Sequence, residues 1–139
     1  MPVFEPIKLI EIVADEVGTP RNDGTPGSAL YQVPIRLSDN PPPEWRELFI
    51  RNWNNPPRFT SMHRPGIASV SGDRVILNGT TLEEIEKYHR ATLLLVVEET
   101  NKQCADLFQQ SQAADAQEAE RQRRHKEEVK KKSDEIRFQ

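Results

Sequence analysis

Side chains that could carry out chemistry are few in this sequence, which holds three histidines and one cysteine among 139 residues. Glu86 and His89 have the Glu-x-x-His spacing of ligands in helical di-metal sites. Those sites need a second such motif and further inward carboxylates, and the sequence has no second motif. We therefore predict that His89 is a partly buried structural residue, and we expect no metal and no cofactor.

Cys104 and His89 are candidates for a nucleophile and its base. Fifteen residues separate them, which is about 22 Å along a helix that rises ~1.5 Å per residue. A nucleophile and its base must lie within about 3 Å of each other, so this dyad is excluded and we predict no catalytic residue. Cys104 ends an apolar stripe, as small core residues do. A small enzyme centred on His63 remains an alternative, if a cleft brings His63 to a carboxylate or to Cys104.

Arginines and aromatic residues are interleaved between Trp45 and Arg64. Arginines beside aromatic rings are typical of protein-binding hot spots and of surfaces for single-stranded nucleic acid. However, Trp45, Phe49 and Trp53 have the spacing of one stripe of an amphipathic helix. The simpler interpretation is that this stripe is buried and that the arginines form the solvated side of the helix.

The segment from Arg58 to Arg64 has no clear periodicity and is predicted to be a loop, which we name the Arg/aromatic loop. A loop needs large apolar and cationic side chains for its own packing less than a helix does, so these residues are candidates for binding. The predicted partner-binding residues come from this loop, the helix before it and the last helix: Trp53, Arg58, Phe59, Met62, His63, Arg64, Cys104, Leu107 and Phe108.

Seven basic side chains lie between Arg121 and Lys132, against Glu127 and Glu128. We name this stretch the basic block, because such a cluster can contact a phosphate backbone. Nucleic-acid binding is therefore an alternative function, through Arg58, Phe59, Arg64, Arg121, Arg123, Arg124, Lys126, Lys130, Lys131 and Lys132. The competing interpretation is a solvated helix or a disordered tail, since no aromatic lies inside the block. The apolar residues of the tail do not sustain a coiled-coil seam.

Charge and hydropathy divide the chain into two parts. Residues 1–108 hold 11 basic and 15 acidic side chains and nearly all of the large apolar ones, whereas residues 109–139 hold 8 basic and 7 acidic side chains. We predict a globular domain at 1–108 and a charged helical or partly disordered tail at 109–139. The net charge of −3 gives no general attraction to nucleic acid or anionic lipid.

Several features favour a cytoplasmic protein. A single cysteine excludes an internal disulfide, and the first residues lack the basic and apolar regions of a signal peptide. The longest apolar run, Leu93 to Val97, is far shorter than the roughly 20 residues that span a bilayer. We expect no membrane partner.

Four strands are predicted. Ile7–Val17 is rich in β-branched residues, and residues 31–37 alternate between apolar and polar with the period of a strand. Residues 67–71 and 74–78 flank Gly72-Asp73 and form a predicted hairpin. Pro34 cannot donate to a sheet ladder, so its strand is expected at an edge or with a bulge.

Two helices are predicted. The first follows the prolines at 41–43, with Asp39 or Asn40 as its cap. The second begins at a capping box of Thr81 and Glu84 and meets no Gly or Pro beyond Gly79. Its length to Phe108 is about 40 Å, against ~20–25 Å for a small sheet. One end is therefore expected to overhang.

The predicted fold is α+β, with a small, four-stranded, mainly antiparallel sheet in ββαββα order. Two helices cover one face, and a long charged C-terminal helical extension follows. The run Leu93–Val97 is apolar all round its helix, which favours a partner, and a second copy of the chain is one candidate. We expect a non-enzymatic interaction protein or an accessory subunit of a complex, docking through the last helix and the Arg/aromatic loop.

Overall fold

The computed structural model describes residues 4–138 and divides the chain into two compact units. The first unit, residues 5–105, is the α+β domain, and the second consists of residues 106–138 together with Phe4. The division falls three residues before the predicted boundary at residue 108. Val3, the first residue of the predicted apolar region, lies outside the described residues.

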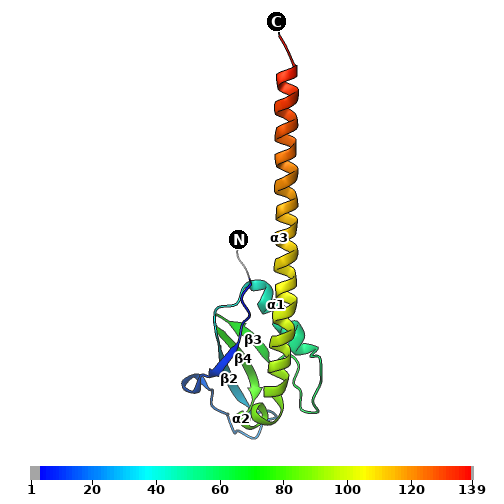
Figure 1. The fold of residues 1–139 in the computed structure, drawn as a ribbon. Coiled ribbons are helices and arrows are strands. Elements are labelled where there is room, and N and C mark those ends of the chain that lie inside the picture. The colour runs from blue at the N-terminus through cyan, green and yellow to red at the C-terminus, as the bar shows by residue number, and fades with distance from the viewer. Residues whose placement is uncertain (1–3, 139) are drawn as a thin grey trace. The chain divides into compact units, whose positions relative to one another are not determined.

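The α+β domain contains one four-stranded antiparallel sheet (Figure 1). Its strands lie in the order β1-β2-β4-β3, and their bounds are β1 (Leu9–Ile12), β2 (Tyr31–Leu37), β3 (Ala68–Ser71) and β4 (Arg74–Thr80). Gly72, with φ of 57°, makes the tight turn between β3 and β4, because glycine adopts positive φ without steric cost. The predicted α+β class, the antiparallel sheet and this hairpin are confirmed.

The first strand is much shorter than predicted, and Pro34 explains where it stops. The Pro34 carbonyl accepts a hydrogen bond from the Val13 amide at 3.0 Å, but proline has no amide hydrogen to return the bond. The chain then leaves the sheet in a 3₁₀ turn, η1 (Ala14–Glu16). β2 lies between β1 and β4, so it is not an edge strand, and the bulge predicted as the alternative has its counterpart in a register irregularity of this strand. Its register irregularity lies at Tyr31/Gln32, away from the proline.

One face of the sheet and two helices enclose the core. On this face Val33 pairs with Leu77 and Ile35 with Val75, and all four side chains are buried. Helix α1 (Pro43–Asn54) adds its predicted stripe, Trp45, Phe49 and Trp53, which has no exposed area. The predicted solvated side of this helix is also found, since Arg51 is exposed. The simpler interpretation therefore holds for this helix, because its aromatic stripe is buried and Arg51 faces the solvent.

The helix starts differ in part from prediction. α1 begins directly after Pro42 with no side-chain cap, so the predicted cap at Asp39 or Asn40 is wrong. The fixed φ of proline prepares the first turn without a cap. At the second helix the Thr81 hydroxyl accepts the Glu84 amide hydrogen at 3.1 Å, as predicted. The Glu84 carboxylate does not return to the Thr81 amide and bonds Arg64 and Thr80 instead.

The second helix is long, as predicted, and continuous through three segments. These are α2 (Leu82–Glu84), a π-helical turn η2 (Ile85–His89), and α3 (Arg90–Glu135). In the α+β domain α3 buries Leu93, Val96 and Val97 and leaves Leu94 55% exposed. Within the described residues, no helix is both long and apolar enough to cross a membrane.

The side chain of Asn101 joins three parts of the α+β domain. Its Oδ1 accepts hydrogen bonds from the Ile7 amide at 3.0 Å and from the Trp45 indole nitrogen at 2.8 Å. Its Nδ2 donates to the Ile7 carbonyl at 2.8 Å. One amide therefore satisfies the segment before β1 and the polar atom of a fully buried tryptophan.

Replacing Asn101 with alanine should lower the free energy of unfolding by about 2–3 kcal/mol, because a buried indole donor and a backbone pair lose their partners. Urea denaturation measures this change. Lys102→Ala, at the exposed neighbouring residue, is the control and should change stability by no more than about 0.5 kcal/mol. Equal effects of the two substitutions would show that the Asn101 contacts do not stabilise the domain.

Candidate interaction site

The Arg/aromatic loop is fastened to the C-terminal end of α1. The Trp53 indole nitrogen donates to the Arg64 carbonyl at 2.9 Å, and His63 Nε2 donates to the Trp53 carbonyl at 2.7 Å. The amide of Gly66 donates to Asn54 Oδ1 at 2.8 Å. A loop tied at several points to a buried helix has little conformational freedom left to lose on binding.

A second attachment joins the loop to the start of the long helix. Arg64 Nε and Nη2 bind the two Glu84 carboxylate oxygens at 3.0 and 2.8 Å, and Thr80 donates to the same carboxylate at 3.0 Å. These hydrogen bonds, first of all that of Arg64, lower the pKa of Glu84, and the bond to Glu84 raises the pKa of Arg64. A bidentate pair of this kind fixes orientation as well as position.

Between these attachments the loop exposes apolar side chains. Phe59 is 61% exposed and Met62 is 36% exposed, while Arg58 beside them is also exposed. The Phe59 ring meets the His63 ring edge-on, with ring centroids 5.4 Å apart. His63 is itself hydrogen-bonded to the Trp53 carbonyl of α1, so the ring that Phe59 contacts is held in place.

The predicted partner-binding residues, apart from Leu107 and Phe108, thus fall into three groups. Arg58, Phe59 and Met62 are exposed together on the loop, whereas His63 and Arg64 are half-buried and act as its attachments. Trp53 and Cys104 have no exposed area and cannot touch a partner in this conformation. Trp53 was named as a candidate for binding, but the simpler interpretation of its helix was a buried stripe, and burial is what the structure shows.

Cys104 is a core residue, which agrees with the interpretation of its apolar surroundings. Burial raises the pKa of its thiol to about 11, with a smaller contribution from the charge of Glu44. The thiolate is the nucleophilic form of cysteine, so this side chain is inert at neutral pH. No other cysteine is present in the sequence.

His89 is more deeply buried than predicted. It has no exposed area, and neither ring nitrogen has a hydrogen-bond partner. Its ring packs on Trp53 with centroids 5.5 Å apart, and its Nε2 lies 3.7 Å from Glu84 Oε1, beyond hydrogen-bond distance. Burial lowers the pKa of His89 below its ordinary value of 6.5, against the opposing attraction of Glu84. The Glu-x-x-His spacing drew attention to this residue, although for metal chemistry.

The hydrogen bond between His63 and the Trp53 carbonyl limits what a catalytic site centred on His63 could do. Since a carbonyl only accepts, Nε2 of His63 carries the hydrogen, and Nδ1 is the free base of the neutral ring. Nδ1 is buried and has no partner, so a substrate cannot reach it in this conformation. Among residues 4–138 no group of three or more His, Cys, Asp or Glu side chains is placed to hold a metal ion.

An open hollow also borders Arg64. It is lined by Thr25, Ala29, Leu30 and Arg64 together with Gly27 and Ser28. The only charged group in this lining is the Arg64 guanidinium, and it is already paired with Glu84. The hollow therefore has little free charge with which to hold an anion.

In the second unit, residues 106–135 of α3 form what we name the tail helix. Its side chains are exposed apart from Phe108, Gln112 and Glu120, which are half-buried. Phe108 meets Phe4 edge-on at 5.5 Å, and Leu107 is 44% exposed. Of the predicted partner-binding residues on the last helix, Leu107 is therefore the most accessible.

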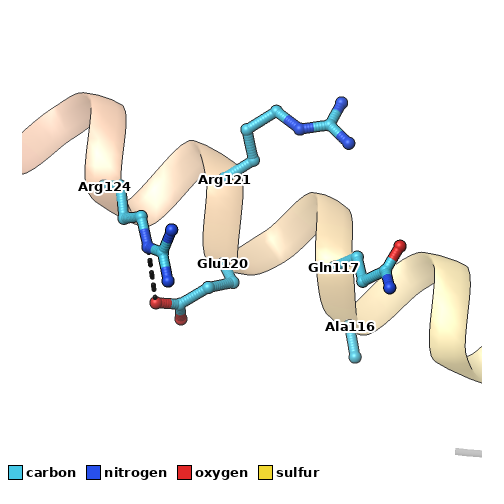
Figure 2. A pocket seen from close by; sticks show the side chains of 5 residues that line it. All are labelled: Ala116, Gln117, Glu120, Arg121 and Arg124. Carbon is cyan, nitrogen blue, oxygen red and sulfur yellow. Dashed lines mark hydrogen bonds and ion pairs between the residues drawn. The ribbon is translucent and has the colours of Figure 1, made fainter.

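The basic block is helical and partly neutralised along its own helix. Arg121 pairs with Glu118 at 2.8 Å, Arg124 with Glu120 at 3.2 Å, and Arg123 with both Glu120 and Glu127. A hollow here is lined by Ala116, Gln117, Glu120, Arg121 and Arg124, and Figure 2 shows that their side chains all project from one helix. A hollow with a single helix as its wall is an open surface rather than an enclosed pocket.

No family model matches this chain, and neither the curated proteins nor the solved structures searched contain a significant match.

The buried His89 should make stability fall as the solution becomes acidic. Folding lowers the pKa of His89, so near pH 6.5 this side chain binds a proton more readily in the unfolded chain than in the folded protein. The contribution of neutral His89 to stability is complete above about pH 6.5. Below that pH the free energy of unfolding falls by up to about 1.4 kcal/mol per pH unit. Urea denaturation between about pH 7.5 and 5.5 measures this slope, and keeps clear of Glu84, whose lowered pKa acts below its ordinary value of 4.5.

His89→Gln should flatten that slope, whereas Lys102→Gln, at an exposed residue of α3, should leave it unchanged. An identical pH dependence of the wild-type protein and the His89 variant would contradict the assignment.

Proposed function

We propose that the protein is a non-enzymatic interaction protein, an accessory subunit of a complex, that docks on a protein partner through the Arg/aromatic loop and the tail helix. The observation that carries the proposal is the loop. Phe59 and Met62 are exposed, yet the residues that follow them are bonded to buried Trp53 and to Glu84. An apolar surface held in place at no benefit to its own core is typical of a binding surface.

The energetics of binding support this interpretation. An exposed phenylalanine that enters a pocket on a partner removes apolar area from water, at about 25 cal/mol per Å². A fixed loop also loses little entropy when it binds. Arg58 beside Phe59 adds a cation that is not paired with any carboxylate in the described ion pairs. The surface therefore suits a partner with an apolar pocket bordered by acidic groups.

Nucleic-acid binding through the loop has less support. Arg64 has both carboxylate-facing nitrogens occupied by Glu84, so it is not free to bind a phosphate. In the basic block, three arginines have partners on their own helix. Exposed ion pairs of this kind are weak, so a phosphate could replace the carboxylate partners of these arginines. Binding of an oligonucleotide at low salt is therefore a separate outcome of the capture experiment.

Phe59→Ala should remove a protein partner that the full-length chain captures from its cell of origin. Mass spectrometry of the captured proteins measures the loss, which should be at least tenfold if the side chain is a hot spot worth about 1.4 kcal/mol or more. Leu82→Ala is the matched control, since Leu82 is also exposed, at 42%, but lies outside the loop.

Equal capture by wild-type protein and the Phe59 variant would contradict docking through the loop. Capture of nucleic acid alone, with an affinity that falls steeply with salt, would replace the proposal with the nucleic-acid alternative.

A further inference from the structure

The exposed apolar side chains of the tail helix lie on one of its faces. Leu107, Val129 and Ile136 are 44%, 47% and 54% exposed. Leu107 and Val129 are 22 residues apart, about six turns at 3.6 residues per turn, and Ile136 follows after 7 more, about two turns. Ile136 lies just past the end of α3, but its amide still bonds the Lys132 carbonyl at 3.2 Å, so it continues the helical path.

Other residues at the same angular position complete this face. Ala114 lies about two turns after Leu107, Glu118 about three turns after it and His125 about five. A shallow hollow follows the middle of the face, lined by Glu118, Arg121, Gln122, His125 and Lys126. We name Leu107, Ala114, Glu118, His125, Val129 and Ile136 the tail face. Ser111 and Lys132 share this angular position, so a polar residue also lies between the apolar residues at each end of the face.

Charge is separated along the tail helix in a way that favours one kind of partner. Residues 106–120 contain four acidic side chains, namely Asp106, Asp115, Glu118 and Glu120, and no lysine or arginine. The basic block that follows holds seven basic side chains against two acidic ones. An antiparallel copy of the same helix therefore places an acidic half beside a basic half twice, whereas a parallel copy places like charges together.

We propose that the tail helix pairs with the tail helix of a second copy of the chain, antiparallel, with Leu107 opposite Ile136 and Ala114 opposite Val129. In this one register Glu118 faces His125, Ser111 faces Lys132, and the two-fold axis passes between Arg121 and Gln122. Each end of the pair brings large apolar side chains together, and the acidic half of each helix lies beside the basic half of the other. Such a self-complementary contact is the isologous kind that two-fold dimers use.

This inference names the partner of the tail-helix surface and rests on that part of the proposed function. The seam is sparse, with polar residues between its apolar ends, so charge attraction must supply part of the affinity. Attraction between exposed charges is screened by salt, with a Debye length of about 30 Å at 0.01 M and about 10 Å at 0.1 M. Light scattering of the full-length chain should therefore record a dimer at low salt whose dissociation constant rises with salt.

Oxidative cross-linking of two cysteine variants tests the register directly. Full-length Ser111→Cys and Lys132→Cys proteins are oxidised separately and as a mixture. In the proposed pair, two copies of residue 111 are about 30 Å apart, from ~1.5 Å per residue over 21 residues, and so are two copies of residue 132. A disulfide needs Cα atoms within about 7 Å, so only the mixture should form a cross-linked dimer, at least tenfold faster than either variant alone. The buried Cys104 makes the wild-type chain a suitable blank.

Rapid cross-linking of Ser111→Cys alone would indicate a parallel pair and overturn the proposal. A wild-type chain that stays monomeric at low salt, with no cross-link above the blank, would also overturn it, whether or not the basic block then binds an oligonucleotide.

A charge on the tail face supplies a second readout that does not depend on cysteine chemistry. Val129→Asp should weaken dimerisation at least tenfold, whereas Ala113→Asp, which adds the same charge on another side of the helix, should not. Circular dichroism checks that both variants stay helical. Equal dimerisation of the two variants would contradict the tail face. Neither experiment involves Phe59, so failure here leaves docking through the Arg/aromatic loop to be judged by its own test.

Discussion

The burial of Trp53 is the constraint on which the rest of the α+β domain depends. Its ring has no exposed area and lies in the stripe of α1 that covers the sheet. Its indole nitrogen and its carbonyl are two of the groups that hold the Arg/aromatic loop, through Arg64 and His63. Since a buried donor left unpaired costs about 1–3 kcal/mol, the packing of the core and the path of the loop stabilise each other.

This coupling also explains the surroundings of His63 and His89, which are distant from each other in the sequence. Trp53 packs against His89 as well as His63, so the same ring removes one histidine from water and supports the other. The loop is thereby held on one side by the core and on the other by the Arg64–Glu84 pair. What the loop leaves exposed is Phe59 with its neighbours, and the Phe59 ring contacts the edge of His63.

Periodicity was sufficient to predict most of the fold. The alternation in β2, the Gly72-Asp73 turn and the stripe of α1 each report a local preference that the structure keeps. The end of β1 was not predictable from its own residues, because it depends on the missing amide hydrogen of Pro34 on the neighbouring strand. In the same way, the loop residues were predicted by type, but their division into attachments and exposed side chains depends on contacts with α1 and Glu84 that are distant in sequence.

The central claim is that the loop, held by Trp53 and Glu84, presents Phe59 to a protein partner. Site-specific photocross-linking in the cell of origin tests it most directly, with a photoreactive phenylalanine analogue at position 59 and, as the control, at exposed position 82. The account predicts that one defined protein is cross-linked from position 59 and is absent from position 82. No cross-link at position 59, or the same products from both positions, would contradict it.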